Sequence, residues 1–199
     1  MSVRNNGSYH HGDLHNALRL SASAILEEEG LSALSLRAVA RRAGVSHAAP
    51  YRHFPNHESL LAELAVDGFS ELRTRIAEAG AGHGTQSDRV AAIGAAYMRF
   101  AAQKPALTRL MFGAQLPNRT EFPALTEAAD TLGAEIGKAL SDAVLGMAAW
   151  GAVHGLAMLV LENVIDLGQR QSGREVLPSR AEILLRSMFS LGADGRVGS

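Results

Sequence analysis

The chain has 199 residues, of which 47% are hydrophobic and 20% are charged, and its formal net charge is −1. A chain this long and this apolar can bury a sizeable core, which excludes intrinsic disorder. The chain has no cysteine, which excludes disulfides, Cys-ligated metal sites and a Cys nucleophile. The near-neutral charge argues against a uniformly basic nucleic-acid coat protein.

The commonest residues are Ala (34) and Leu (26), and both favour helix, so we expect an all-α fold. Residues 1–11 are polar and predict a flexible arm. This opening stretch has no apolar run, so it is not a secretory signal.

Three helices are predicted in the first quarter of the chain. The first runs from Asp13 to about Glu29 and is stopped by Gly30. Two shorter helices, Leu36–Ala43 and His47–Phe54, are separated by a turn at Gly44. This is the layout of a helix-turn-helix. The residues that can cap the three helices are Asp13, Ser35 and Ser46.

A fourth, longer helix is predicted from Asn56 to about Glu78. The residues that mark its buried side are Leu60, Leu61, Leu64, Gly68, Leu72 and Ile76. The glycines at 80, 82 and 84 then form the best candidate boundary in the chain.

Beyond this boundary the pattern is again helical. We expect a helix opened by Thr85 and Asp88, a short helix over 107–114, a loop over 117–123 and a helical region over 124–167 with weak breaks at Gly146 and Gly168. A last helix is predicted over 179–191. The inward residues expected in the first of these helices are Val90, Ile93, Tyr97 and Phe100.

Local charge distinguishes the helix-turn-helix from the rest of the chain. The stretch 30–57 contains Arg37, Arg41, Arg42 and Arg52 and no acidic residue. A charge run often marks only a solvated face. Its coincidence with the turn favours a phosphate-binding surface instead.

These residues also carry a family resemblance. The run Ser35-Leu36-Arg37-Ala38-Val39-Ala40-Arg41-Arg42-Ala43-Gly44-Val45-Ser46, followed by Tyr51-Arg52-His53-Phe54 and Glu58-Ser59-Leu60-Leu61, resembles the DNA-binding signature of the TetR family of bacterial transcription regulators. The resemblance implies a DNA-binding domain over 12–72, with its helix-turn-helix motif at 35–54. It also implies a long connecting helix and a separate helical ligand-binding and dimerisation domain over 85–195.

The candidate DNA contacts lie within this motif. His47 and Arg52 can make polar contacts, whereas Ala48 and Ala49 can offer only apolar contact to bases. Pro50 and His57 depart from the family, which most often has a larger aliphatic residue and a Lys there. The full candidate set is Ser35, Arg37, Ser46, His47, Ala48, Ala49, Tyr51, Arg52, His53 and His57.

The C-terminal half is less informative about its ligand. Trp150, His154 and Gly155 resemble the Trp-His-Gly signature of one C-terminal domain type in the family. Trp150, His154, Met158, Leu161 and Ile165 share one helical face, which forms either core or dimer seam or part of a ligand pocket. The candidate pocket residues are Phe100, Met111, Phe112, Phe122, Trp150 and His154.

The last two helices, over about 145–167 and 179–191, resemble the family's dimerisation pair. Pairing them across a two-fold axis would place two DNA-reading units about one DNA turn apart, or slightly more, so the operator should be an inverted repeat. Such an interface also accounts for the uncharged run 143–161, which has the length of a membrane span but lacks basic flanks.

Two other classes of function were weighed against this one. A metal-dependent helical enzyme would need a His-Glu-x-x-His pair or a comparable set of ligands, which the sequence lacks. A structural DNA-binding protein would bind through phosphates alone, with little sequence preference. The resemblance favours a cytoplasmic, homodimeric repressor that responds to a small-molecule effector and needs no cofactor.

Overall fold

The computed structural model describes residues 11–82, 85–116, 118–140 and 143–166, together with residues 183 and 187. Within these ranges every regular element is helical and no strand occurs, which confirms the all-α prediction. The α-helices and the 3₁₀ helices (η) are α1 (His11–Glu29), η1 (Leu31–Ala33), α2 (Leu36–Arg42), η2 (Pro50–Arg52), α3 (His57–Gly80), α4 (Gln86–Gln103), α5 (Pro105–Phe112), η3 (Arg119–Glu121), α6 (Pro123–Leu140) and α7 (Ala143–Leu161).

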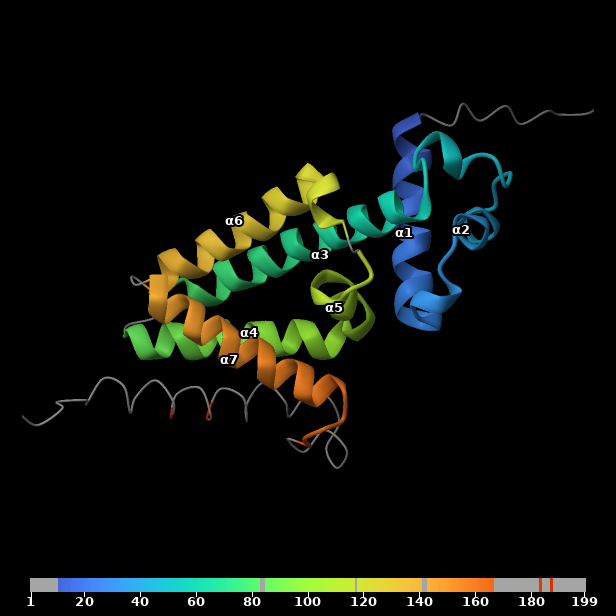
Figure 1. Cartoon of the computed structure of the whole chain (residues 1–199). Helices are drawn as coiled ribbons and strands as arrows, with labels where there is room; N and C mark the ends of the chain where they lie inside the picture. Colours follow the sequence, from blue (N-terminus) through green and yellow to red (C-terminus); the bar gives the residue numbers. More distant parts are fainter. Residues whose placement is uncertain are drawn as a thin grey trace, which may run out of the picture.

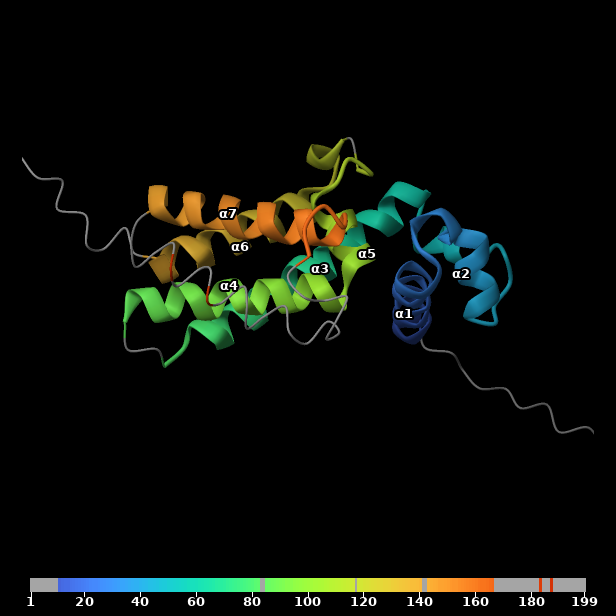
Figure 2. The ribbon, with the colours of Figure 1, turned by 90° about the horizontal axis from the view of Figure 1, so that it is seen from below.

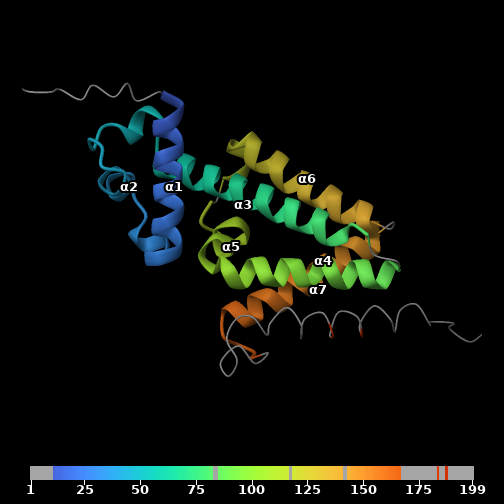
Figure 3. The same cartoon turned by 180° about the vertical axis from the view of Figure 1, so that it is seen from behind.

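The long helix α3 joins the two ends of the molecule. In Figure 1, α1 and α2 lie at one end, and α3 runs away from them into a bundle with α4, α6 and α7. Seen from behind, α6 and α4 lie along opposite sides of α3 (Figure 3), and the view from below shows α7 alongside α6 (Figure 2). The short helix α5 lies at the junction and contacts both α1 and α3.

Three helices begin at the polar residues that the sequence indicates. The side chain of Ser35 accepts a hydrogen bond from the amide of Ala38 at 3.2 Å, and Asn56 accepts one from Ser59 at 2.8 Å. Thr85 accepts one from the amide of Asp88 at 3.1 Å. Each cap satisfies an amide that has no partner inside the helix and contributes about 1 kcal/mol.

The core follows the predicted apolar faces. Leu18, Ala22, Ile25 and Leu26 of α1 are buried, as are all six residues expected on the inner side of α3. The four residues expected to point inward from α4 are buried as well. The helical periodicity of the sequence therefore places the core correctly in these three helices.

Helix α7 differs from its prediction in two respects. The predicted helical region corresponds to two helices, α6 ending at Leu140 and α7 beginning at Ala143, and α7 continues through Gly146, where the sequence predicts a weak break. Between Gly146 and Leu161, where burial is described, the buried residues of α7 are Gly146, Ala149, Val153, Ala157 and Val160. The predicted face from Trp150 to Ile165 is only half-buried, because the helix turns the face with Ala149, Val153 and Ala157 toward the core instead.

Two predicted segments lie outside the described residues. They are residues 1–10 of the expected arm and the last helix over 179–191, apart from positions 183 and 187. The arm was expected to include residue 11, but α1 already begins at His11.

Candidate DNA-binding surface and ligand cavity

The segment after α2 is where the fold departs most from the sequence prediction. The prediction of a helix over His47–Phe54 is wrong, because the structure has turns around the short 3₁₀ helix η2 there. Pro50 has no amide hydrogen to donate to the Ser46 carbonyl, as an α-helix would require. That carbonyl instead accepts a hydrogen bond from the amide of Ala49 at 3.0 Å.

The turn between α2 and this segment depends on a glycine. Gly44 has a φ of 69°, in the left-handed region that favours glycine. The amide of Val45 then donates to the carbonyl of Ala40 at 3.0 Å, which closes the end of α2. Phe54 is 1% exposed and anchors the far end of the segment in the core, whereas Tyr51 is 51% exposed.

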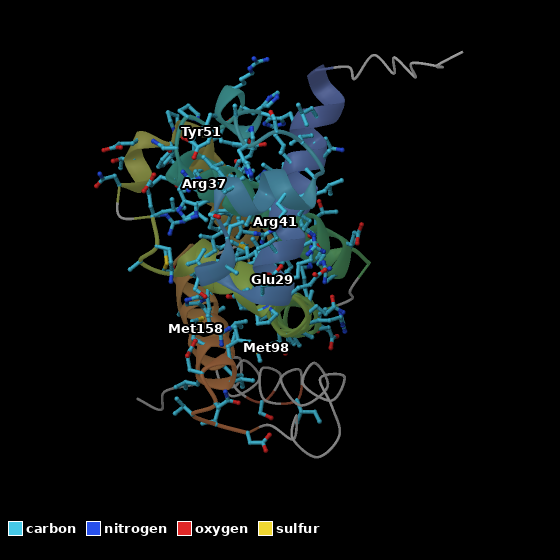
Figure 4. All side chains as sticks on the ribbon, turned by 90° about the vertical axis from the view of Figure 1, so that its right-hand side faces the viewer. Glu29, Arg37, Arg41, Tyr51, Met98 and Met158 are labelled. Atoms are coloured by element: carbon cyan, nitrogen blue, oxygen red, sulfur yellow. The ribbon has the colours of Figure 1, made fainter. Side chains whose placement is uncertain are left out.

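Three arginines at this end of the molecule are free of acidic partners among the described residues. Arg37, Arg41 and Arg52 are exposed, and Figure 4 shows Arg37, Arg41 and Tyr51 on the same end of the protein. Arg42 is different, because its guanidinium lies 2.8 Å from Glu28 and 3.7 Å from Glu29. Of the four arginines counted in the sequence, three therefore remain available to contact DNA.

The other candidate DNA contacts differ in accessibility. Ser46, His47 and Ala48 are exposed and Ala49 is half-buried. Ser35 is exposed, but its hydroxyl accepts the hydrogen bond that caps α2. The half-buried His53 lies beside His15, with 5.5 Å between ring centroids.

His57 is the candidate whose geometry fits DNA contact least well. It is half-buried at the start of α3, and its Nε2 is enclosed without a hydrogen-bond partner among the described residues. A contact to phosphate from this side chain would therefore have to use Nδ1.

Polar side-chain contacts connect α1 to the first half of α3. Arg19 pairs with Asp67, and the Nε2 of His15 lies 3.1 Å from a carboxylate oxygen of Glu63. These contacts connect α1, which packs against α2, to the long helix.

A further contact joins α1 to α5. One carboxylate oxygen of Glu27 accepts a hydrogen bond from the amide of Leu107 at 2.9 Å. Leu107 is the third residue of α5, where amides lack a partner within the helix and favour negative charge. Glu27 therefore caps α5 from the unit that carries the helix-turn-helix.

The second candidate site is a cavity of about 410 Å³ beside α3, α6 and α7, open to solvent. This volume falls within the range of small-molecule sites, and its wall is mostly apolar, as is usual for them. The residues that line it are Phe69, Phe112, Arg119, Ala129, Leu132, Gly133, Ile136, Gly137, Gly146, Met147 and Trp150.

Two of the six candidate ligand residues, Phe112 and Trp150, line this cavity. Phe100 is fully buried and carries the guanidinium of Arg75 5.4 Å from its ring. Met111 is also fully buried and packs against Gly68. A Cβ atom at position 68 would come within 2.5 Å of the Met111 sulfur. Phe122 packs against the core outside the lining.

His154 lies behind the cavity wall in an aromatic cluster. The hydroxyl of Tyr97 and the Nδ1 of His154 are 2.8 Å apart and share a hydrogen bond. The His154 ring stacks on Trp150 at 11° and lies 4.6 Å from the ring of Phe112. Burial lowers the pKa of His154 and raises that of Tyr97, so both side chains are neutral at neutral pH.

Sequence reasoning missed several residues of the cavity wall. Phe69 comes from α3, within the stretch assigned to DNA binding, and Arg119 comes from a segment expected to be a loop. The signal that could have identified the wall is the spacing of Ala129, Gly133 and Gly137, which places three small residues on one face of α6.

The alternative sites considered from the sequence find no counterpart in the described part of the chain. No three His, Asp or Glu side chains gather there in a way that would hold a metal ion. No helix of the described ranges is both long and apolar enough to cross a membrane.

Comparison with protein families identifies both parts of the chain. Residues 20–64 match the family described as bacterial regulatory proteins, tetR family. Residues 90–176 match the tetracyclin repressor-like C-terminal domain. The chain therefore belongs to the tetR family of bacterial regulatory proteins, a family of transcription regulators with a helix-turn-helix rather than of enzymes. The Trp-His-Gly subtype stays a prediction.

Individual relatives agree with this assignment. The HTH-type transcriptional regulator Rv1816 of Mycobacterium tuberculosis is 35% identical over 94 residues, which are 46% of this chain and only 40% of that protein. The uncharacterized HTH-type transcriptional regulator Rv0681 of the same organism is 27% identical over 154 residues, or 73% of this chain and 69% of that protein.

Solved structures share the fold along most of the chain. A protein of unknown function from Rhodococcus sp. RHA1 has a TM-score of 0.74 and 30% identity, covering 91% of this chain and 98% of that one. The regulator FadR from Bacillus subtilis, solved with stearoyl-CoA, has a TM-score of 0.66 and 16% identity, with 87% and 98% covered. At 16% identity, the similarity to FadR shows a shared fold alone.

Proposed function

We propose that this protein is a sequence-specific repressor that binds an inverted-repeat operator as a homodimer and responds to a small-molecule effector. The observation that carries the proposal is the exposed, acid-free set Arg37, Arg41 and Arg52 around a helix-turn-helix. The residues 12–72 would bind DNA, and the residues 85–195 would bind the effector and form the dimer. Such a protein works in the cytoplasm, where the chromosome lies, and needs no cofactor.

Arg37 and Arg41 lie on α2, so we assign them to phosphates, which position the protein but carry no sequence information. His47 and Arg52 flank the exposed alanine at 48, and we assign these three to base edges in the major groove. Tyr51 is 51% exposed, and its hydroxyl is free to donate to a phosphate oxygen.

The exposed face of α7 supports the proposed dimer. Met147, Gly151, Gly155 and Leu159 are spaced by four residues and are all exposed, with Met147 at 72%. This face carries no charge, and its glycines would let a second helix approach closely. A second copy of the chain, paired through α7 and the segment that follows it, would cover the face.

Placing a charge on this face should separate the protomers. Gly155→Glu adds a carboxylate where nothing lies within 4 Å of the new Cβ, so the protomer itself should still fold. We expect sedimentation to shift from dimer to monomer and operator affinity to fall with it. Ala134→Glu, on an exposed part of α6 four residues before Lys138, is the matched control and should remain dimeric. A dimeric Gly155→Glu protein would rule out this face.

The response to an effector needs a route from the cavity to the DNA-binding end, and α5 supplies one. Its C-terminal residue Phe112 lines the cavity, while its N-terminal turn is capped by Glu27 of α1. An effector that displaces Phe112 would shift α5 and, through Glu27, the orientation of α1. FadR, the structural neighbour solved with stearoyl-CoA, supports a small-molecule effector for this fold.

Glu27→Ala tests this connection without an effector. Loss of the cap should lower the free energy of unfolding by about 1 kcal/mol. It should also speed hydrogen exchange at the first amides of α5. Glu28→Ala is the neighbouring control, because Glu28 pairs only with Arg42 on the surface and should leave α5 unchanged. Unchanged exchange in α5 of Glu27→Ala would show that this contact is not the link.

A further inference from the structure

Among the described residues, the cavity wall contains one charged side chain, that of Arg119, beside apolar and small residues. The guanidinium lies 5.8 Å from the ring centroid of Phe69, and its Nη2 donates to the carbonyl of Met111 at 2.7 Å. It forms no ion pair with a described residue, and this one bond leaves other donors free. A half-buried guanidinium without a carboxylate partner favours an anion at this place.

One side of the cavity is formed by a row of small residues on α6, which we call the trough. Ala129, Gly133 and Gly137 of α6 lie one turn apart along its wall, and nothing lies within 4 Å of a Cβ added to either glycine. At 1.5 Å per residue these positions span about 12 Å. A fully extended chain advances about 3.5 Å per three bonds, so roughly ten bonds fill that length.

The charged side chain and the row of small residues follow one another along the cavity. Arg119 belongs to η3, which directly precedes α6, so it lies toward the N-terminal end of the trough, with Gly137 toward the other end. The volume of about 410 Å³ holds roughly a dozen non-hydrogen atoms at the ~30 Å³ that a water molecule occupies in the liquid. A ligand that fits has an anionic head and an unbranched apolar tail.

We propose that the effector of this protein is a medium-chain carboxylate, held by its carboxylate at Arg119 with its alkyl chain along the glycines of α6. This inference rests on the proposed effector response and assigns the chemical class of the effector. Arg119 sets the preference for the anion, and Gly133 and Gly137 provide the room for the chain. Trp150, the one tryptophan in the sequence, lines the cavity and reports its occupancy.

The test is a titration of the full-length protein followed by tryptophan fluorescence and calorimetry, with decanoate, decan-1-ol and decyltrimethylammonium as probes. Decanoate should bind at least about tenfold more tightly than the other two, because only it can accept charge-assisted hydrogen bonds. Equal affinities for decanoate and decanol would overturn the proposal. So would tight binding of decanoyl-CoA without binding of decanoate, because the thioester lacks the carboxylate.

Substitutions at two positions distinguish the contribution of the carboxylate to binding from that of the alkyl chain. Arg119→Met should weaken decanoate binding roughly 10- to 100-fold and leave decanol within about threefold, while Arg119→Lys should restore most of the loss. Gly133→Leu should abolish binding of both probes by filling the trough, and Ala134→Leu, one residue along the helix, should not. Equal losses of both probes in Arg119→Met, or decanoate binding retained in Gly133→Leu, would contradict the assignment.

These measurements contain no DNA, so they are independent of the proposed regulator function. Failure of decanoate to bind a protein that still recognises one operator sequence would reject the ligand class alone. Failure to recognise any sequence would reject the regulator function instead.

Discussion

Replacing Arg37 and Arg41 together by Ala is expected to weaken DNA binding by at least about 100-fold. Each side chain is exposed on α2 and lacks an acidic partner among the described residues, so each is free to bind a phosphate. A hydrogen bond to a charged group contributes roughly 1.5–3 kcal/mol, and two of them per protomer are lost. Binding should weaken alike for all DNA sequences, because phosphate contacts carry no sequence information.

The measurement is fluorescence anisotropy with labelled duplexes over a range of salt concentrations. The slope of log affinity against log salt should fall by about one for each lost phosphate contact. Arg42→Ala removes the same charge from the same helix, but Arg42 is already paired with Glu28 and Glu29, so its effect should be much smaller. If Arg42→Ala weakened binding as much, net charge rather than specific contacts would control affinity.

Two aromatic residues of the same turn should differ strongly in how much they contribute to stability. Phe54→Ala is expected to lower the free energy of unfolding by roughly 3–5 kcal/mol, because the ring is 1% exposed and stacks on His15 in the core. Tyr51→Ala should change stability by less than about 0.5 kcal/mol, because its ring is half-exposed. Its effect should instead appear in DNA affinity.

Urea denaturation followed by circular dichroism measures both variants against the unchanged protein. The result that would contradict this account is a Tyr51→Ala protein as destabilised as Phe54→Ala. In that case Tyr51 would be a core residue and the DNA-facing side of the turn would be misassigned.

Three helix starts and the buried face of α3 were predictable because they depend on neighbouring residues, whereas α1 begins at His11, before the predicted cap Asp13, and no α-helix begins at Ser46. Ser35, Asn56 and Thr85 each cap a helix through an amide three residues along the chain, and sequence spacing alone indicates such contacts. The buried face of α3 follows in the same way from helical periodicity.

What could not be predicted depends on contacts between distant segments or on a single special residue. The pairing of Arg42 with Glu28 spans 14 residues and is invisible to a count of local charge. The segment expected to be an α-helix contains the 3₁₀ helix η2, which begins at Pro50, a residue without an amide donor. The cavity combines Phe69 of α3 with Arg119 of η3, and only the folded chain brings these two together.

The most direct test of the central claim is selection of binding sites from a random DNA pool at a physiological salt concentration of about 0.15 M. A dimeric, sequence-specific regulator should enrich one inverted repeat with its half-sites about one helical turn of DNA apart, or slightly more. A folded protein that bound the pool with no enriched sequence would contradict sequence-specific regulation and would indicate binding through phosphates alone.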